Sequence, residues 1–153
     1  MEFEKGEYNF NKDLISGENG EKFIGKFIRD RGMVFDHKRY DNKYDLAFSF
    51  NQRVYTYEIK TDIYPRDTGN IVVEFECRGK PSGISVTTAD YFVNFFPHLG
   101  EIWNIKTKSL LNIIQENNLD VFQNSGDKNS NTKLYKIPKK KFESLFKVYR
   151  LKS

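Results

Sequence analysis

One β-hairpin in the sequence restricts the folds open to this chain. Two runs of alternating side chains, 45–50 and 54–60, are joined by the three residues Asn51-Gln52-Arg53. Each run places its large apolar residues on one face and most of its polar residues on the other, because successive side chains of a strand point to opposite sides. The chain is therefore expected to build a β-sheet around this hairpin, with the apolar face seated in the core.

The polar residues of the hairpin include two acids and a lysine. A three-residue turn puts Asp45 opposite residue 59, within one position of Glu58. Glu58 and Lys60 lie two positions apart, so their side chains project from the same face of the strand. Two carboxylates and one amine are thus expected to converge at one end of the sheet.

Such a group of side chains suits a site for a hard divalent cation. Mg²⁺ prefers oxygen ligands and usually keeps several waters for a phosphate substrate. A lysine beside the cation can orient or activate the attacking water and stabilise charge on the phosphate. Acidic and basic residues also alternate on many solvated strand faces, so the pattern alone does not separate the two interpretations.

Helical and strand-like segments alternate along the rest of the chain. Apolar residues at helical spacing predict a helix that begins at Ser16 or Gly17 and stops before Gly32. Thr88 is expected to cap a further helix that ends at Phe96. The other predicted elements are strands at 33–35, 71–78 and 101–106, an edge strand at 134–137, helices at 107–117 and 139–149, and a loop at 123–132.

This order of elements predicts an α/β fold in which helices flank a mixed central sheet. A length of 153 residues fits a single domain with one core. Aromatic residues make up 16% of the chain, which a disordered protein would not carry. One cysteine and two histidines argue against an internal disulfide, a cysteine-based zinc site and a three-histidine metal site. With no apolar run near the roughly 20 residues of a bilayer span, and no secretory signal pattern, we expect a cytoplasmic protein.

Basic residues are concentrated near the C-terminus. The formal net charge is +4, and eight lysines or arginines but only one acid lie in the segment 133–153. That segment suits either a surface that faces nucleic-acid phosphates or a solvated tail. Lys139, Lys140 and Lys141 are its densest part. The core of the single domain is expected at about 14–117, apart from this basic segment.

The hairpin and its surroundings resemble the PD-(D/E)XK nuclease superfamily, most closely its archaeal-type Holliday junction resolvases and their phage-encoded relatives. The resemblance rests on a helix that opens Gly17-Glu18-Asn19-Gly20-Glu21, on Tyr44-Asp45, on Glu58-Ile59-Lys60-Thr61, and on the segment 73–91. It covers about half of the chain, residues 17–96. Tyr44 stands where that family has a proline that shapes the turn.

The resemblance implies a restriction-endonuclease-like core and a Mg²⁺-dependent endodeoxyribonuclease that Mn²⁺ also supports. Asp45 and Glu58 would hold the metal together with the Ile59 carbonyl, and Lys60 would be the catalytic lysine. Glu21 would reach the metal or its waters from the helix. A metal-bound water would then hydrolyse a phosphodiester in DNA recombination or repair.

The DNA substrate and the partners follow less directly. Arg78, Lys80 and Ser82 in a basic turn, and Lys139–Lys141, are candidates for phosphate contacts. Branched or junction DNA is the expected substrate and a homodimer the expected assembly, in the host cytoplasm if a phage encodes the chain. Two alternatives stay open: a structure-specific, single-strand, restriction or repair nuclease of the same fold, and a non-catalytic DNA-binding module. Glu74 and Glu76 are either part of the site or an exposed strand face.

Overall fold

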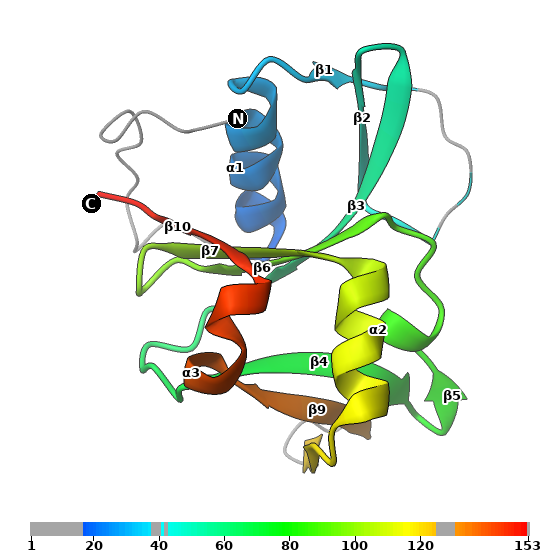
Figure 1. Cartoon of the computed structure of the whole chain (residues 1–153), viewed down its shortest axis with the longest axis vertical. Coiled ribbons are helices and arrows are strands. Elements are labelled where there is room, and N and C mark those ends of the chain that lie inside the picture. Colours follow the sequence, from blue (N-terminus) through cyan, green and yellow to red (C-terminus); the bar gives the residue numbers. More distant parts are fainter. Residues whose placement is uncertain (1–16, 38–40, 42, 125–130, 153) are drawn as a thin grey trace.

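The computed structural model describes residues 17–37, 41, 43–124 and 131–152. Within these ranges the chain forms two β-sheets and two longer helices (Figure 1). The larger sheet has the order β1-β2-β3-β6-β7-β10, and the smaller has the order β5-β4-β9-β8. β3 and β6 run parallel, whereas the other neighbours in the larger sheet are antiparallel, so that sheet is mixed. The strands are β1 (Val34–Phe35), β2 (Leu46–Phe50), β3 (Arg53–Thr61), β4 (Asn70–Cys77), β5 (Lys80–Pro81), β6 (Tyr91–Phe96), β7 (Glu101–Lys106), β8 (Asp120–Asn124), β9 (Thr132–Pro138) and β10 (Lys147–Arg150), and the α-helices are α1 (Gly17–Arg29), α2 (Thr107–Glu116) and α3 (Lys139–Phe142).

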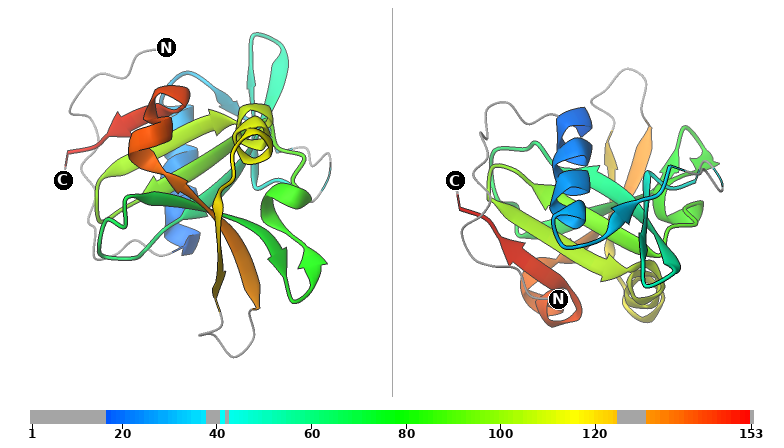
Figure 2. Two further views of the ribbon diagram at one scale, coloured as in Figure 1. Left: turned by 60° about the horizontal axis from the view of Figure 1, so that its bottom comes forward. Right: turned by 90° about the horizontal axis from the view of Figure 1, so that it is seen from above.

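Helix α1 covers one face of the larger sheet (Figures 1 and 2). Its buried apolar stripe packs in one cluster with side chains from β2, β3, β6 and β7. Tyr57 and Ile59 of β3 belong to that cluster. Because side chains alternate along a strand, Glu58 and Lys60 project from the face that α1 does not cover.

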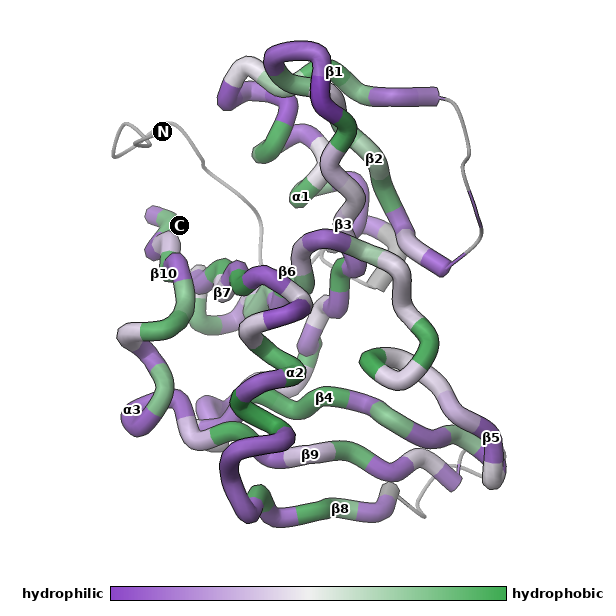
Figure 3. Tube along the Cα trace, turned by 45° about the vertical axis from the view of Figure 1, so that its right-hand side comes forward, coloured by the Kyte–Doolittle hydropathy of each residue, from purple (hydrophilic) through white to green (hydrophobic). Residues whose placement is uncertain are grey.

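The second face of the larger sheet packs against α2 and the smaller sheet. Phe92 and Trp103 from the larger sheet share a buried cluster with Leu110 of α2 and with Ile71 and Ile137 of the smaller sheet. Figure 3 shows hydrophobic and hydrophilic residues interleaved along β4, β8 and β9. The smaller sheet can therefore bury one face while it leaves polar groups on the other.

The predicted hairpin at 45–60 is confirmed, with a register that differs by one residue from the prediction. Asn51 and Gln52 both have positive φ angles, 49° and 65°, and form a two-residue turn with Phe50 paired to Arg53. Such turns match the twist of the flanking strands better than the predicted three-residue turn. Extended past Leu46, this register places Asp45 opposite Glu58 and not opposite residue 59.

The predicted helix from Thr88 to Phe96 is wrong. Residues 91–96 form β6, the strand between β3 and β7 in the larger sheet. Strands that are covered on both faces carry nearly continuous apolar runs, and such a run cannot be told from a buried helix by periodicity alone. Asp90, directly before β6, accepts the Thr56 backbone N–H at 2.9 Å and ties the start of β6 to β3.

The C-terminal part also differs from the prediction. Helix α3 spans only Lys139–Phe142, and the predicted helix at 139–149 ends there because 147–150 form β10, paired with β7. The predicted edge strand at 134–137 is the central strand β9, covered on its outer side by β8. β8 takes up the start of the predicted loop at 123–132, whose residues 125–130 lie outside the described part of the chain.

The remaining predicted elements agree with the structure. A mixed sheet and flanking helices in one α/β domain are confirmed, as are the helices that begin at 17 and 107 and the strands near 34, 71 and 101. Gly32 has a φ of 88° and closes the turn after α1, as expected for a residue that ends a helix. Across the described ranges, no helix is long and apolar enough to cross a bilayer.

Candidate functional site

Asp45 is fixed to the end of β3 by two hydrogen bonds. It lies directly before β2, and its backbone N–H donates to the Tyr57 carbonyl at 2.9 Å. Its carboxylate Oδ2 accepts the backbone N–H of Ile59 at 2.7 Å. The acid is thereby held beside the residues that precede and follow Ile59, which are Glu58 and Lys60.

Glu58 is more enclosed than Lys60. Only 13% of its side chain is exposed, against 44% for Lys60, whose Nζ lies 3.4 Å from Glu58 Oε1. Burial raises the pKa of Glu58, and the negative charge of Asp45 raises it further. Lys60 and a hydrogen bond from Thr87 oppose this increase in pKa. A half-buried acid beside a second acid is a place where added positive charge is favourable.

The site offers oxygen atoms that suit a divalent cation. A carboxylate has about four lone-pair positions, so Asp45 can accept the Ile59 N–H and still act as a ligand. The N–H and C=O of one strand residue point to the same side, so Ile59 also directs its carbonyl toward the side of Asp45. Two carboxylates and one carbonyl fit Mg²⁺ or Mn²⁺, which complete their coordination with water.

Thr87 supports Glu58 from the segment before β6. Its hydroxyl has two acceptors for its one proton, the Lys43 carbonyl at 3.0 Å and Glu58 Oε2 at 3.4 Å. The hydroxyl oxygen itself accepts the Ala89 N–H at 3.2 Å. Thr87 therefore links Glu58 to the residues just before Asp45, a positioning role that the sequence analysis did not assign.

Glu21 lies on α1, one residue after Gly20, which approaches Thr61 at the end of β3. It faces a pocket on the α1 side of the larger sheet that Leu46, Phe48 and His37 also line. Within the described residues, no three acidic, histidine or cysteine side chains lie close enough to hold a metal ion together. The structure brings Asp45 and Glu58 together, and the role of Glu21, directly or through water, stays a prediction.

The predicted DNA contacts at 78–82 lie on a hairpin between β4 and β5. Arg78 and Gly79 form its two-residue turn, with φ angles of 54° and 76°, and Cys77 pairs with Lys80. Arg78 and Lys80 are exposed, as a phosphate contact requires. The Ser82 hydroxyl differs, because it is buried without a hydrogen-bond partner in the described part of the structure.

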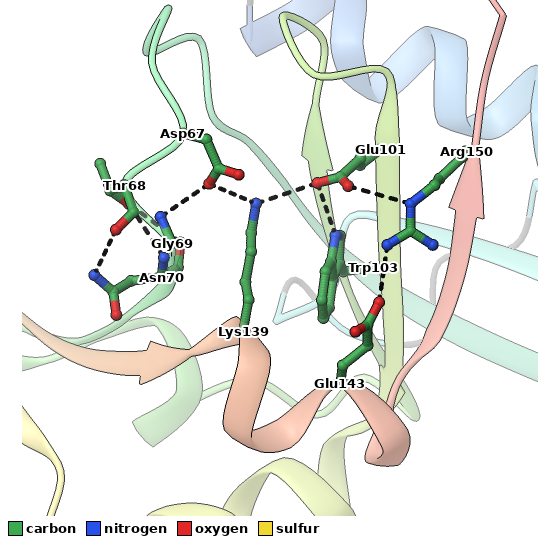
Figure 4. A network of polar contacts seen from close by, with 9 residues as sticks. All are labelled: Asp67, Thr68, Gly69, Asn70, Glu101, Trp103, Lys139, Glu143 and Arg150. Atoms are coloured by element: carbon green, nitrogen blue, oxygen red, sulfur yellow. Dashed lines mark hydrogen bonds and ion pairs between the residues drawn. The ribbon is translucent and has the colours of Figure 1, made fainter.

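The three consecutive lysines 139–141 have different surroundings. Figure 4 shows Lys139 between Asp67 and Glu101. Lys139 is 7% exposed, and its Nζ lies 3.2 Å from both Asp67 and Glu101 and 4.0 Å from the centre of the Phe96 ring. This ammonium is committed to holding the segment after β3 against β7. Lys140 and Lys141 are exposed, and they alone keep the predicted role in phosphate binding.

A cleft of about 590 Å³ opens beside Lys60. Asn94 of β6 and Glu74 of β4 line it, together with the segment that follows Lys60. Glu76 is instead paired with Lys133 at 3.0 Å. Glu74 thus shares a cleft with the predicted catalytic lysine, whereas Glu76, on the same strand, is held in an ion pair with Lys133 of β9. Asn94 was missed in the sequence, although one polar residue in the apolar run 91–96 is a signal.

Comparison of the chain with protein-family models, with curated proteins and with solved structures finds no match. The resemblance to PD-(D/E)XK nucleases therefore rests on the residues themselves, chiefly Asp45, Glu58 and Lys60.

Proposed function

We propose that this chain is a metal-dependent DNA endonuclease of the PD-(D/E)XK type, related to Holliday junction resolvases. One observation carries the proposal: Asp45 is anchored beside Glu58, and the Lys60 ammonium lies 3.4 Å from that second carboxylate. Two acids and a lysine with these separations match the needs of phosphodiester hydrolysis better than those of a solvated strand face. On such a face, Glu58 would not be 13% exposed beside another acid.

Asp45, Glu58 and the Ile59 carbonyl would hold Mg²⁺ or Mn²⁺. The bound cation would act as a Lewis acid on the phosphate and would favour ionisation of the attacking water. The Ile59 N–H fixes the Asp45 carboxylate beside Glu58, so these residues would hold the cation at one end of β3. Thr87 holds Glu58 from its other oxygen.

Lys60 is placed for two tasks in the reaction. Its ammonium projects from the same face as Glu58 and lines the cleft, so it can donate hydrogen bonds to a phosphate oxygen or to the attacking water. Its positive charge also favours the ionised form of Glu58. Lys60 therefore both prepares the ligand and stabilises negative charge on the substrate.

The wider architecture is compatible with this assignment. A restriction-endonuclease-like core, with a mixed sheet whose hairpin carries the acids, is part of the proposal. We further propose a homodimer, since two symmetric cuts in a junction require two sites. Light scattering of the protein at high concentration tests this, and a monomer that still binds junctions would exclude it.

The direct test is cleavage of a labelled four-way junction beside a matched duplex and a matched single strand. Each substrate is incubated with Mg²⁺, Mn²⁺ or EDTA and with wild type or Lys60→Ala. Paired symmetric nicks in the junction alone, lost with EDTA and in the variant, would establish a resolvase. Metal-dependent cutting of the other substrates would support the assigned site but indicate a nuclease of another specificity. Tight binding without any cleavage would indicate a binding module.

A further inference from the structure

The cleft beside Lys60 has features that a flat phosphate-binding surface does not need. Its volume of about 590 Å³ is in the range of small-molecule pockets. Residues from both sheets line it, together with Ile63 and Tyr64 from the segment after β3. In a continuous duplex the bases are stacked and paired, so only the phosphates and the groove edges can contact such a site, and no base enters the cleft.

The wall of the cleft includes a buried amide, the side chain of Asn94. Asn94 is 5% exposed, and its Nδ2 has no hydrogen-bond partner among the described residues. Asn94 pairs in register with Lys60 in the parallel strands β3 and β6, so both side chains project from the same face. A buried donor without a partner costs free energy, and a ligand with an acceptor group would remove that cost.

The other polar group of the wall has the opposite character. Glu74 comes from β4 and supplies a carboxylate, which accepts hydrogen bonds. Gly83 lets its own backbone approach this wall closely, because a side chain there would collide with the Glu74 carbonyl. The cleft therefore presents a donor on one sheet and an acceptor on the other, and the edges of nucleobases carry both kinds of group.

The rim of the cleft carries an exposed aromatic ring. Tyr64 is 51% exposed although it lines the cleft. Its segment is anchored at both ends, by the Asp62 N–H to the Phe95 carbonyl at 2.8 Å and by Asp67 to Lys139 at 3.2 Å. Aromatic rings held in this way serve as platforms on which single bases stack.

We propose that this cleft binds one unpaired nucleotide next to the phosphate that is cut. The inference rests on the proposed nuclease function and makes it more specific: the substrate is DNA with an unpaired or extruded base at the cut site. Tyr64 stacks on the base, Asn94 and Glu74 bind its edge, and Lys60 lies at the adjoining phosphate. Extruding a base from an intact duplex costs a few kcal/mol, whereas a base that is already unpaired avoids most of that cost.

Binding without catalysis tests the cleft. Fluorescence anisotropy in EDTA compares a single strand, a duplex with one bulged nucleotide and a continuous duplex, for wild type and Tyr64→Ala. Loss of one stacked base is expected to weaken binding to the first two DNAs by about five- to a hundredfold. Binding to the continuous duplex should change less than twofold.

Three further variants separate stacking from misfolding. Tyr64→Phe keeps the ring and should bind like wild type, and Phe50→Ala removes another exposed aromatic, 38% exposed, at the far end of the hairpin. Asn94→Ala should weaken binding to the single strand and to the bulged duplex about fivefold. The melting temperature of this variant should stay within a few degrees of that of wild type. Equal losses on all three DNAs, or no loss with Tyr64→Ala, would overturn the proposed cleft.

The outcomes also distinguish this inference from the nuclease function itself. If the protein with Mg²⁺ cuts DNA, but Tyr64→Ala discriminates bulged from continuous duplex as wild type does, the cleft proposal fails and the nuclease stands. If no DNA is cut but the binding pattern appears as expected, the nuclease proposal fails and the protein is a binder of unpaired nucleotides.

Discussion

The Asp45 carboxylate accepts the backbone N–H of Ile59 at 2.7 Å. This contact joins the start of β2 to the end of β3. It places the Asp45 carboxylate beside Glu58 and Lys60, the two residues that flank Ile59. A strand exposes alternate side chains on one face, so Glu58 and Lys60 reach the same side while Ile59 enters the core. The arrangement needs only a hairpin and one side-chain-to-backbone hydrogen bond.

Removal of any of the three charged groups should abolish cleavage. Lys60→Met is expected to lower the rate of metal-dependent cutting by about 10²- to 10⁴-fold, because the reaction loses its positively charged donor. Asp45→Asn and Glu58→Gln should do the same through metal binding. Single-turnover cleavage measures the rate, and Glu76→Gln, whose acid pairs with Lys133 in the smaller sheet, serves as the matched control. Full activity in any of the three variants would refute the assigned site.

Ionisation of Glu58 should make the metal-free protein less stable as pH increases. Its pKa is raised in the folded state above the ordinary value of 4.5, so the native state retains this proton to higher pH than the unfolded state does. The stability contribution of Glu58 is present below pH 4.5 and is lost as pH rises through the raised pKa. Chemical denaturation at several pH values in EDTA measures the effect, which should be smaller in Glu58→Gln.

Metal should stabilise the protein only while Glu58 can ionise. At pH 7, Mn²⁺ or Mg²⁺ is expected to raise the melting temperature of wild type, because ligands that bind only the native state increase its stability. Glu58→Gln should melt at a higher temperature than wild type in EDTA and respond little to either cation. A wild-type protein whose melting is insensitive to millimolar Mn²⁺ would contradict the assigned metal ligands.

Thr87→Val should shift the pH dependence of cleavage. The Thr87 hydroxyl lies 3.4 Å from Glu58 Oε2 and helps to keep the pKa of Glu58 down. Without it, that pKa rises further, and the acid limb of the pH–rate profile should move to higher pH. Thr87→Ser retains the hydroxyl and should restore the wild-type profile. An unchanged profile with a reduced melting temperature would leave Thr87 a purely structural role.

Lys139 should matter for stability, and its neighbour Lys140 for DNA binding. Lys139→Met leaves Glu101, 15% exposed, with less positive charge nearby, so the free energy of unfolding should fall by about 2 kcal/mol. Lys140→Met should change stability by less than about 0.5 kcal/mol. It should instead reduce the salt dependence of DNA binding by about one phosphate contact. Urea denaturation and binding at several salt concentrations separate the two effects.

The convergence of Asp45, Glu58 and Lys60 was predictable from the sequence because these residues are local in the hairpin. Alternation along 45–50 and 54–60 predicts the strands, and a short turn brings their outer ends together. The acids and the lysine then meet whatever the rest of the chain does. A one-residue error in the turn shifted the expected partner of Asp45 from Glu58 to residue 59, without separating the charges.

The tertiary structure decided what surrounds that hairpin. The apolar run 91–96 has no period that separates a buried strand from a buried helix, and its pairing with β3 and β7 made it a strand. That pairing brought Asn94 beside Lys60, and the smaller sheet brought Glu74 to the same cleft. Glu21 faced a different pocket because α1 covers the opposite face of the sheet. Contacts between residues far apart in the chain depend on which faces are buried together, and local side-chain patterns do not carry that information.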